Sequence, residues 1–291
     1  MKKYKVKDGV SVIPKSQTVI EEDALFGRFD LKRVSIHNGV NEIGWGAFEF
    51  CGNLSDITSL GSVSEIGGCA FRGCISLKSV TIPVSVTEIG ASAFQDCTTL
   101  TSIVIPDSVT IIKDETFMDC TNLKVIVVPK SLKKIEFGAF AGCASLTKFI
   151  IPDSVKEVEE ATFAGCTSLA KIIIPNSITK IGFKAFYGCS NLKTISIPLS
   201  VTKIEEEAFR GCNSLTTIII PDSVIEIGGL AFADCTNLTD ITLPKSVIEI
   251  GPYIFEKSTA LKAINVPTNK ADHYRSLLPK ELHRLIVELP L

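Results

Sequence analysis

The stretch IPDSVTIIKDETFMDCTNLKVIVV, residues 105–128, recurs along most of the chain in near-identical copies. Successive copies are displaced by 23 residues. Cysteine keeps this spacing from Cys51 to Cys235, and phenylalanine keeps it from Phe48 to Phe255. A fixed period of about 20–50 residues predicts a solenoid, in which each repeat buries its apolar face only against its neighbours.

The apolar residues within one copy predict a strand on one side of the coil and a short helical turn on the other. Ile103 and Ile105 alternate with Val104, which predicts a strand with two buried side chains and one exposed. Equivalent strands of successive coils then pair as a parallel sheet. Phe94 and Cys97 lie three residues apart and share one face of a helical turn opposite the strand.

The boundaries of the repeat pattern divide the chain into an array and two caps. Counted from the repeated proline position, eleven coils fill residues 14–266, which we expect to form one elongated domain. Residues 1–13 contain Asp8-Gly9 between apolar residues and predict a small capping hairpin. Residues 267–291 lose the pattern and predict a C-terminal cap made of a helix over 271–278 and a final strand.

Two local departures from the pattern carry expectations of their own. Residues 50–62 are expected to be irregular, because Ser59 occupies an inward position and Leu60 replaces the repeated proline. The residue before each repeated cysteine is Gly or Asp in most coils, which favours a left-handed backbone there. Phe50 breaks that second pattern. The one tryptophan, Trp45, is expected to pack at an edge.

Nine of the ten cysteines occupy one repeat position, so stacked coils would place them about 4.8 Å apart. That separation does not forbid disulfides, but parallel Cβ vectors suit the bond poorly. We favour buried free thiols, because free cysteine behaves as a small apolar residue. No metal site is expected, since histidine is nearly absent from the coils and no Cys-x-x-Cys pair exists.

Charge and hydropathy limit the partners. The chain has 30 Lys and Arg against 32 Asp and Glu, a balance that argues against nucleic acid. No stretch reaches the ~18 apolar residues of a membrane span, so no membrane insertion is expected. If the sequence is the whole protein, the lack of an export signal predicts a cytoplasmic location, and a trimmed chain or another export route would place it at the cell surface. We expect a monomer.

No group of side chains in the sequence predicts catalysis. The histidines are His37, His273 and His283, near the two ends of the chain, and no serine or acid recurs beside them. The glycines do not form a phosphate-binding loop, so no cofactor is expected. The chain is therefore interpreted as a non-enzymatic protein, with no catalytic, cofactor-binding or metal-binding residues.

The copy at residues 220–243, IPDSVIEIGGLAFADCTNLTDITL, resembles the BspA-like leucine-rich repeat family, also called the Treponema pallidum-type repeat. The resemblance covers residues 13–267. It implies a curved, right-handed solenoid of the α/β leucine-rich-repeat class. The better-known members are surface proteins of bacteria or protozoa that bind host proteins or other cells, and the family brings no catalytic residues.

The residues that vary between coils indicate where a partner could bind. The outward strand residue is aliphatic in the middle coils and polar towards both ends. We call these aliphatic residues the apolar stripe: Val104, Val127, Ile150, Ile173 and Ile219. Two residues before members of the stripe lie Val125, Lys148 and Lys171, which we include in the candidate surface. Solenoid sheets are common binding surfaces, so the stripe predicts binding of another, unidentified protein through the outer sheet face.

Two alternatives stay open at this point. β-branched residues stack well in any parallel ladder, so the stripe could serve packing alone in a passive spacer array. The second alternative is a charged turn face around Lys133, Lys156 and Lys180, which mixes lysines with glutamates and reads most simply as a solvated surface. An exported form would act as a cell-surface adhesin.

Overall fold

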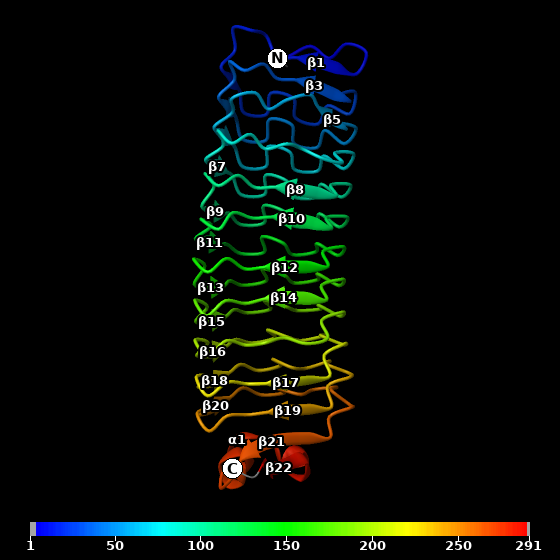
Figure 1. Ribbon diagram of the computed structural model, residues 1–291. Coiled ribbons are helices and arrows are strands. Elements are labelled where there is room, and N and C mark those ends of the chain that lie inside the picture. Colours follow the sequence, from blue (N-terminus) through cyan, green and yellow to red (C-terminus); the bar gives the residue numbers. More distant parts are fainter. Residues whose placement is uncertain (1–3, 290–291) are drawn as a thin grey trace. The chain divides into compact units, whose positions relative to one another are not determined.

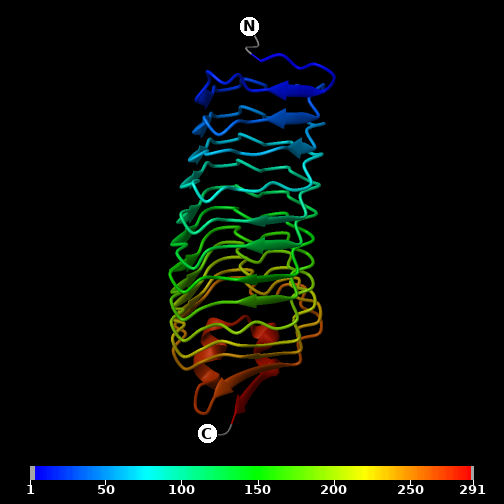
Figure 2. The same ribbon diagram turned by 45° about the horizontal axis from the view of Figure 1, so that its top comes forward.

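The computed structural model describes residues 4–289, which fall into two compact units divided between Leu146 and Thr147. In both units the chain winds as a parallel β-solenoid whose coils repeat every 23 residues (Figure 1). Two sets of short strands lie at separate places on each coil, as the tilted view in Figure 2 also shows. The predicted solenoid class is thus confirmed.

The first ladder carries the strands that the alternation of buried and exposed residues predicted. In the first unit Ser102 pairs with Val125 and Val104 with Val127, a register of one full repeat. Its strands in this unit are β1 (Val10–Val12), β3 (Arg33–Ser35), β5 (Asp56–Ile57), β8 (Ser102–Val104) and β10 (Val125–Val127). In the second unit they are β12 (Lys148–Ile150), β14 (Lys171–Ile173), β17 (Thr217–Ile219), β19 (Asp240–Thr242), β21 (Ala263–Pro267) and β22 (Ile286–Leu289).

A second ladder of two-residue strands follows the proline turn of each coil. Each strand except β20 buries its second residue, and the first residue is exposed or half-buried. In the first unit the strands are β2 (Val19–Ile20), β4 (Glu42–Ile43), β6 (Glu65–Ile66), β7 (Glu88–Ile89), β9 (Ile111–Ile112) and β11 (Lys134–Ile135). In the second unit they are β13 (Glu157–Val158), β15 (Lys180–Ile181), β16 (Lys203–Ile204), β18 (Glu226–Ile227) and β20 (Glu249–Ile250).

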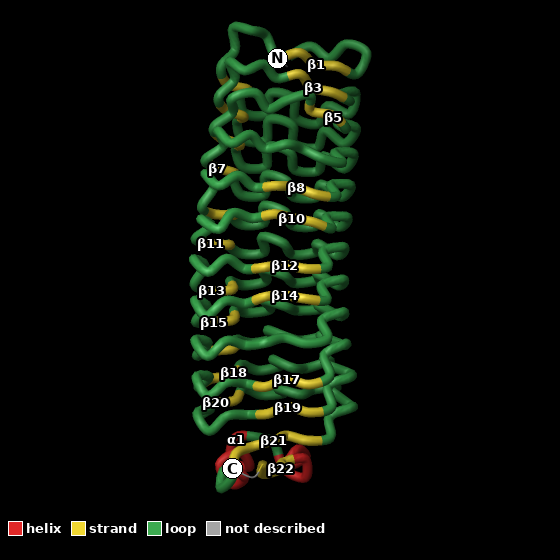
Figure 3. The backbone as a smooth tube through the Cα atoms, in the orientation of Figure 1, coloured by secondary structure: helices red, strands yellow, loops and turns green. Residues whose placement is uncertain are grey.

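The expected short helical turns are consecutive hydrogen-bonded turns in the structure (Figure 3). Within one coil the amide of Gln95 donates to the carbonyl of Ser92 at 3.1 Å. The alternate amide, that of Phe94, donates instead to Thr116 of the next coil at 2.9 Å. Half of the turn amides thus bind the neighbouring coil, which a helix could not allow because its amides bind within the helix.

Left-handed residues shape these turns at two positions per coil. The expected position before the cysteine is left-handed, and even Phe50 adopts φ 55° there. A second left-handed position lies four residues earlier and was not predicted. Its occupants include Cys69 at φ 54°, Ser92 at φ 55° and Glu115 at φ 54°, so no single residue type marks it.

The core of each coil is built on the repeated phenylalanine and cysteine. Consecutive Phe rings stack in parallel, with centroids 5.2 Å apart for Phe48 and Phe71 and 5.3 Å apart for Phe186 and Phe209. All ten cysteines are free and buried, as favoured above. Thiols at the repeated position also donate hydrogen bonds to backbone carbonyls of the preceding coil, for example at 3.2 Å from Cys97 to Phe71 and at 3.1 Å from Cys51 to Leu25.

The N-terminal segment differs from the predicted hairpin. The turn at Asp8-Gly9 is present, with φ 51° and 80° and reciprocal bonds between the backbones of Lys7 and Val10. Lys7 and Val10 thus form a single antiparallel bridge of the predicted hairpin, and β1 otherwise pairs in parallel with β3. β1 is therefore the first strand of the sheet. Its sequence has the same alternation of outward and inward residues as β3, one repeat earlier.

The predicted irregularity is present within residues 50–62, and it extends further along the chain than expected. Ser59 is exposed rather than inward, and its hydroxyl accepts the amide of Gly61 at 2.9 Å, while Leu60 is buried. The sheet interruption continues through residues 79–81, where a single bridge from Ser79 to Ser102 remains. Residues 194–196 likewise lack an assigned strand.

The second unit ends with the predicted helix and strand. Helix α1 (Ala271–Leu277) is followed by the 3-10 helix η1 (Lys280–Leu285) and then by β22, which pairs in parallel with β21. Tyr274 of α1 is fully buried, and its hydroxyl donates to the carbonyl of Pro244. That bond attaches α1 to the preceding coil.

Candidate partner-binding surface

In the first unit, the predicted surface residues lie side by side on β8 and β10. Val104 is 60% exposed and Val127 is 51% exposed, and the two face each other across the ladder. Val125 is also more than half exposed. These aliphatic side chains are largely exposed to water, so they contribute little hydrophobic stabilisation to the free protein. Their apolar area is available for burial against another molecule.

In the second unit, β12 and β14 carry four of the predicted residues. Ile150 pairs with Ile173, and Lys148 pairs with Lys171, all directed outward and exposed. Ile219 on β17 is 71% exposed. The polar Ser196 occupies the same repeat position between Ile173 and Ile219, so the apolar stripe is interrupted within this unit.

Each unit has a shallow groove beside the stripe. In the first unit a groove of about 720 Å³ is lined by Val84, Val104, Val127 and Lys130. In the second, a groove of about 530 Å³ is lined by Leu199, Ile219 and neighbouring turn residues. Both grooves lie where the first strand of a coil leads into the proline turn.

Two of the groove residues were missed by the sequence analysis. Val84 and Leu199 are 88% and 77% exposed, the highest exposures among the large apolar side chains given for the described residues. Each follows a repeated proline, at a position where other coils carry residues such as Asp107 or Lys130. The signal in the sequence was an apolar residue at a position where other coils have a charged one.

Exposed aliphatic residues are not confined to the stripe. Ile225 and Ile248, beside the second ladder of the second unit, are 47% and 68% exposed. They lie one repeat apart, as Ile150 and Ile173 do. They therefore provide a matched comparison for any test of the stripe.

The first unit also has exposed aromatic side chains on its turns. Trp45 is 49% exposed, so it is less covered than edge packing would require. Phe26 and Phe50 form an edge-to-face pair at 5.8 Å, and the guanidinium of Arg72 lies 5.7 Å from the Phe50 ring. These contacts hold the rings in place, and Arg72 makes a cation–π contact with Phe50.

Two lysines of the charged turn face in the second unit are paired with carboxylates. Lys180 lies 3.2 Å from Glu157, and Lys203 lies 2.7 Å from Glu226. Partial burial lowers the pKa of Lys180, but the hydrogen bond with Glu157 and the negative charges of Glu205, Glu157 and Glu159 together outweigh it, so the net pKa is raised. The hydrogen bond with Glu226 raises the pKa of Lys203. These lysines therefore stay charged and paired, as expected of a solvated face.

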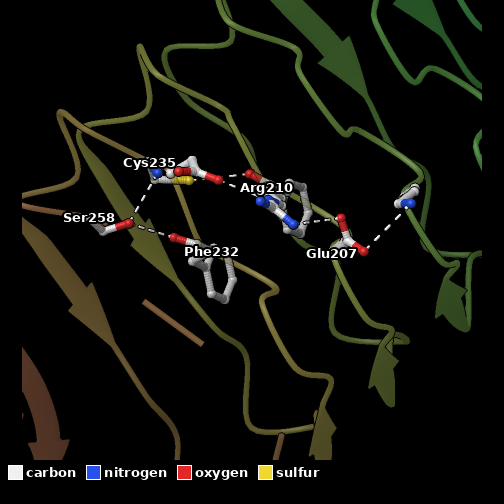
Figure 4. A network of polar contacts seen from close by, with 8 residues as sticks. Glu207, Arg210, Phe232, Cys235 and Ser258 are labelled. Atoms are coloured by element: carbon white, nitrogen blue, oxygen red, sulfur yellow. Dashed lines mark hydrogen bonds and ion pairs between the residues drawn. The ribbon is translucent and has the colours of Figure 1, made fainter. Parts of the chain in front are cut away.

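A polar network on the turns of the second unit is likewise satisfied (Figure 4). The guanidinium of Arg210 bonds Asp234 at 2.8 Å and Glu207 at 3.2 Å, and Lys184 lies 3.6 Å from Glu207. The hydrogen bond with Asp234 raises the pKa of Arg210. Every carboxylate of this network is paired with a cation. The network therefore has a structural role and offers no unpaired group for a reaction.

Titratable groups elsewhere do not assemble a reaction centre in the part of the chain described. Each histidine ring bonds a backbone carbonyl: His37 that of Pro14, His273 that of Val247 and His283 that of Leu278. Desolvation raises the pKa of the Cys69 thiol, which opposes formation of a nucleophilic thiolate. Residues 4–289 contain no cluster of side chains suited to a metal ion, and no helix among them is long and apolar enough to cross a membrane.

Comparison with known proteins matches the chain to a family described as the BspA type leucine rich repeat region. The overlapping matches cover residues 9–124, 46–170, 87–215 and 158–277. A search of curated proteins gives no significant match. The repeat family and the period found in the sequence therefore agree.

Solved structures with the same fold include two similar bacterial proteins. A leucine-rich repeat protein from Bacteroides ovatus is 28% identical, with a TM-score of 0.55, over 97% of this chain and 92% of that chain. A leucine rich cell surface protein from Faecalibacterium prausnitzii is 26% identical, with a TM-score of 0.54, over 99% and 92%. A leucine-rich repeat protein from Eubacterium ventriosum, at 20% identity and a TM-score of 0.55 over 86% and 82%, shares the fold.

Proposed function

Because this chain belongs to the BspA-type leucine-rich repeat family, we propose that it is a non-catalytic module that binds another protein through its outer sheet face. The observation that carries the proposal is the exposure of the apolar stripe, from 41% at Ile173 to 71% at Ile219. A spacer array gains nothing from exposed Val and Ile at these positions, whereas a binding surface buries them in the complex. The adjoining grooves offer room for side chains of the partner.

The test compares two double variants of the whole protein. Ile150→Thr with Ile173→Thr changes the stripe, and Ile225→Thr with Ile248→Thr makes the same change beside the second ladder. Both should melt close to the unmodified protein, because exposed strand positions span only about 1 kcal/mol of propensity. The readout is the affinity for a protein captured from the source organism's lysate or from host surface extracts.

The stripe variant should bind the captured protein about tenfold to a thousandfold more weakly, since central apolar residues of an interface each contribute about 1–2 kcal/mol or more. The comparison variant should bind normally. Unchanged affinity in a stripe variant that melts normally would assign the stripe to ladder packing. The charged turn surfaces, at Lys133 in the first unit and at Lys156 and Lys180 in the second, would then be tested separately.

A second candidate function is adhesion at a cell surface. It is favoured by the 26% identity, over 99% of this chain, to a protein described as a leucine rich cell surface protein. Protease added to intact cells of the source organism should digest the protein if it acts there. Full protection from protease in intact cells, with digestion after lysis, would place it inside and leave the binding module without an adhesive role.

A further inference from the structure

The second unit contains two pairs of lysines that face each other in register across neighbouring strands. Lys180 of β15 pairs with Lys203 of β16, and Lys148 of β12 pairs with Lys171 of β14. Like charges directly opposite in a sheet repel each other, so each pair requires compensation. The protein supplies compensating carboxylates to one of the two pairs and not to the other.

The first pair is neutralised by the protein itself. Glu157 contacts Lys180 at 3.2 Å and Glu226 contacts Lys203 at 2.7 Å, so each ammonium group has a carboxylate. The side-chain ammonium groups of Lys148 and Lys171, which we call the lysine pair, have no ion-pair or hydrogen-bond partner among the described residues. The other outward residues on their strands are Ile150 and Ile173, which offer no oxygen.

On this surface the lysine pair forms one column across the two strands, and Ile150 with Ile173 forms a second column beside it. Along each strand the lysine and the isoleucine are two residues apart, which places them about 6.6 Å from each other on the same face. An extended peptide repeats that distance between its own residues i and i+2. A segment with an acidic residue at one of these positions and an apolar residue at the other therefore matches both columns at once.

We infer that the second unit recognises an extended, acidic protein segment in which a carboxylate bearing residue lies two positions from an aliphatic or aromatic one. This inference rests on the proposed binding function and adds the chemistry of the partner. The carboxylate lies between the ammonium groups of the lysine pair, and the apolar side chain covers Ile150 and Ile173. A neutral or basic segment leaves the repulsion between the two lysines in place.

The probe is a phage-displayed library of random dodecapeptides, selected on the whole protein. Enriched peptides should contain Asp or Glu two positions from an apolar residue more often than the input library. As soluble peptides, they should bind Lys148→Gln with Lys171→Gln about tenfold more weakly, since two exposed charge pairs are lost. Lys180→Gln with Lys203→Gln removes the same charge from the neutralised pair and should change affinity by less than about twofold.

Several outcomes overturn the inference. These are no enrichment over the input, equal weakening by both lysine variants, and unchanged binding to the Lys148 and Lys171 variant. Stronger competition by heparin fragments or single-stranded DNA than by the acidic peptides overturns it as well, in favour of a polyanion. Peptides that depend on Ile150 and Ile173 but not on the lysine pair leave the proposed function standing and remove only the acidic partner. Peptides whose binding depends neither on Ile150 and Ile173 nor on the lysine pair would refute both proposals.

Discussion

The hydroxyl of Ser258 donates a 2.7 Å hydrogen bond to the carbonyl oxygen of Phe232 (Figure 4). In the coil before, the thiol of Cys235 donates to Phe209 in the same way, at 3.2 Å. Ser258 stands where nine coils have cysteine, so the position requires a small hydrogen-bond donor and not only an apolar residue. A donor at this place joins each coil to the one before it.

Ser258→Ala should destabilise the second unit by about 1–3 kcal/mol. The Ser258 oxygen also accepts the buried amide of Cys235 at 3.0 Å, and the alanine leaves that amide without an acceptor. Ser276→Ala, at an exposed hydroxyl of α1, serves as the control and should cost less than about 0.5 kcal/mol. Denaturant unfolding measures both, and equal stability of the two variants would refute the role of Ser258.

The ten cysteines should be free but unreactive while the protein is folded. A thiol reagent should modify few groups in the native protein and about ten after denaturation without reductant, because burial prevents access and thiolate formation. The measurement is a colorimetric titration in both states. Recovery of only one or two thiols from the denatured, unreduced protein would show that disulfides exist.

Stability should fall steeply at alkaline pH. Desolvation raises the pKa of Cys235 to about 12 and holds those of Cys74 and Cys97 well above 9.0. Below pH about 9 the thiols are neutral in both states and their contribution is fully present; above it the unfolded thiols ionise first, so stability is lost as pH rises. Each such thiol lowers the free energy of unfolding by about 1.4 kcal/mol per pH unit.

Thermal melts followed by circular dichroism from pH 8 to 11 measure this dependence. Cys97→Ser with Cys120→Ser keeps a donor at both positions and removes two titrating groups, so its melting temperature should decline less steeply. A melting temperature that stays level up to pH 11 in the unmodified protein would contradict the assignment of buried neutral thiols.

Ala161→Gly should stabilise the protein by about 0.5–1 kcal/mol. Ala161 has φ 51°, a left-handed conformation that costs a residue with a Cβ about 1–2 kcal/mol, and glycine relieves it at a smaller entropic cost. Ala164 lies in the same turn outside the left-handed region, so Ala164→Gly should destabilise by about 0.5–1 kcal/mol. Chemical denaturation of both variants gives the comparison, and a shift of the same sign in both would contradict the argument.

The repeat itself made the first ladder predictable, whereas the second ladder of two-residue strands was not predicted. Inward and outward residues alternate with the strand, and the register of Val104 with Val127 equals the sequence period. The position of the candidate surface on the sheet followed from the same alternation. Its use by a partner stays a prediction, because exposure alone does not distinguish binding from ladder packing.

Other features could not be predicted from one sequence. The three-residue spacing of Phe94 and Cys97 fits a helical turn and a series of tight turns equally well. Only inter-coil bonds such as that of Phe94 to Thr116 separate the two structures, and they link residues that no local pattern connects. The strand β1 was likewise assigned to a hairpin, because the Asp8-Gly9 turn gave a local signal and the pairing with β3 did not.

The turn bonds and the sheet register have a consequence for how such a chain changes in length. Phe94 binds Thr116 of the next coil, and Ser102 faces Val125, and within a unit such links recur at the same offsets from one coil to the next. Duplication or loss of one whole coil leaves the remaining links at the same offsets between adjacent coils. Loss of a single residue shifts the strands that follow and turns buried side chains outward. Recombination between copies of the repeat can therefore lengthen or shorten the array without a new fold, in steps of 23 residues.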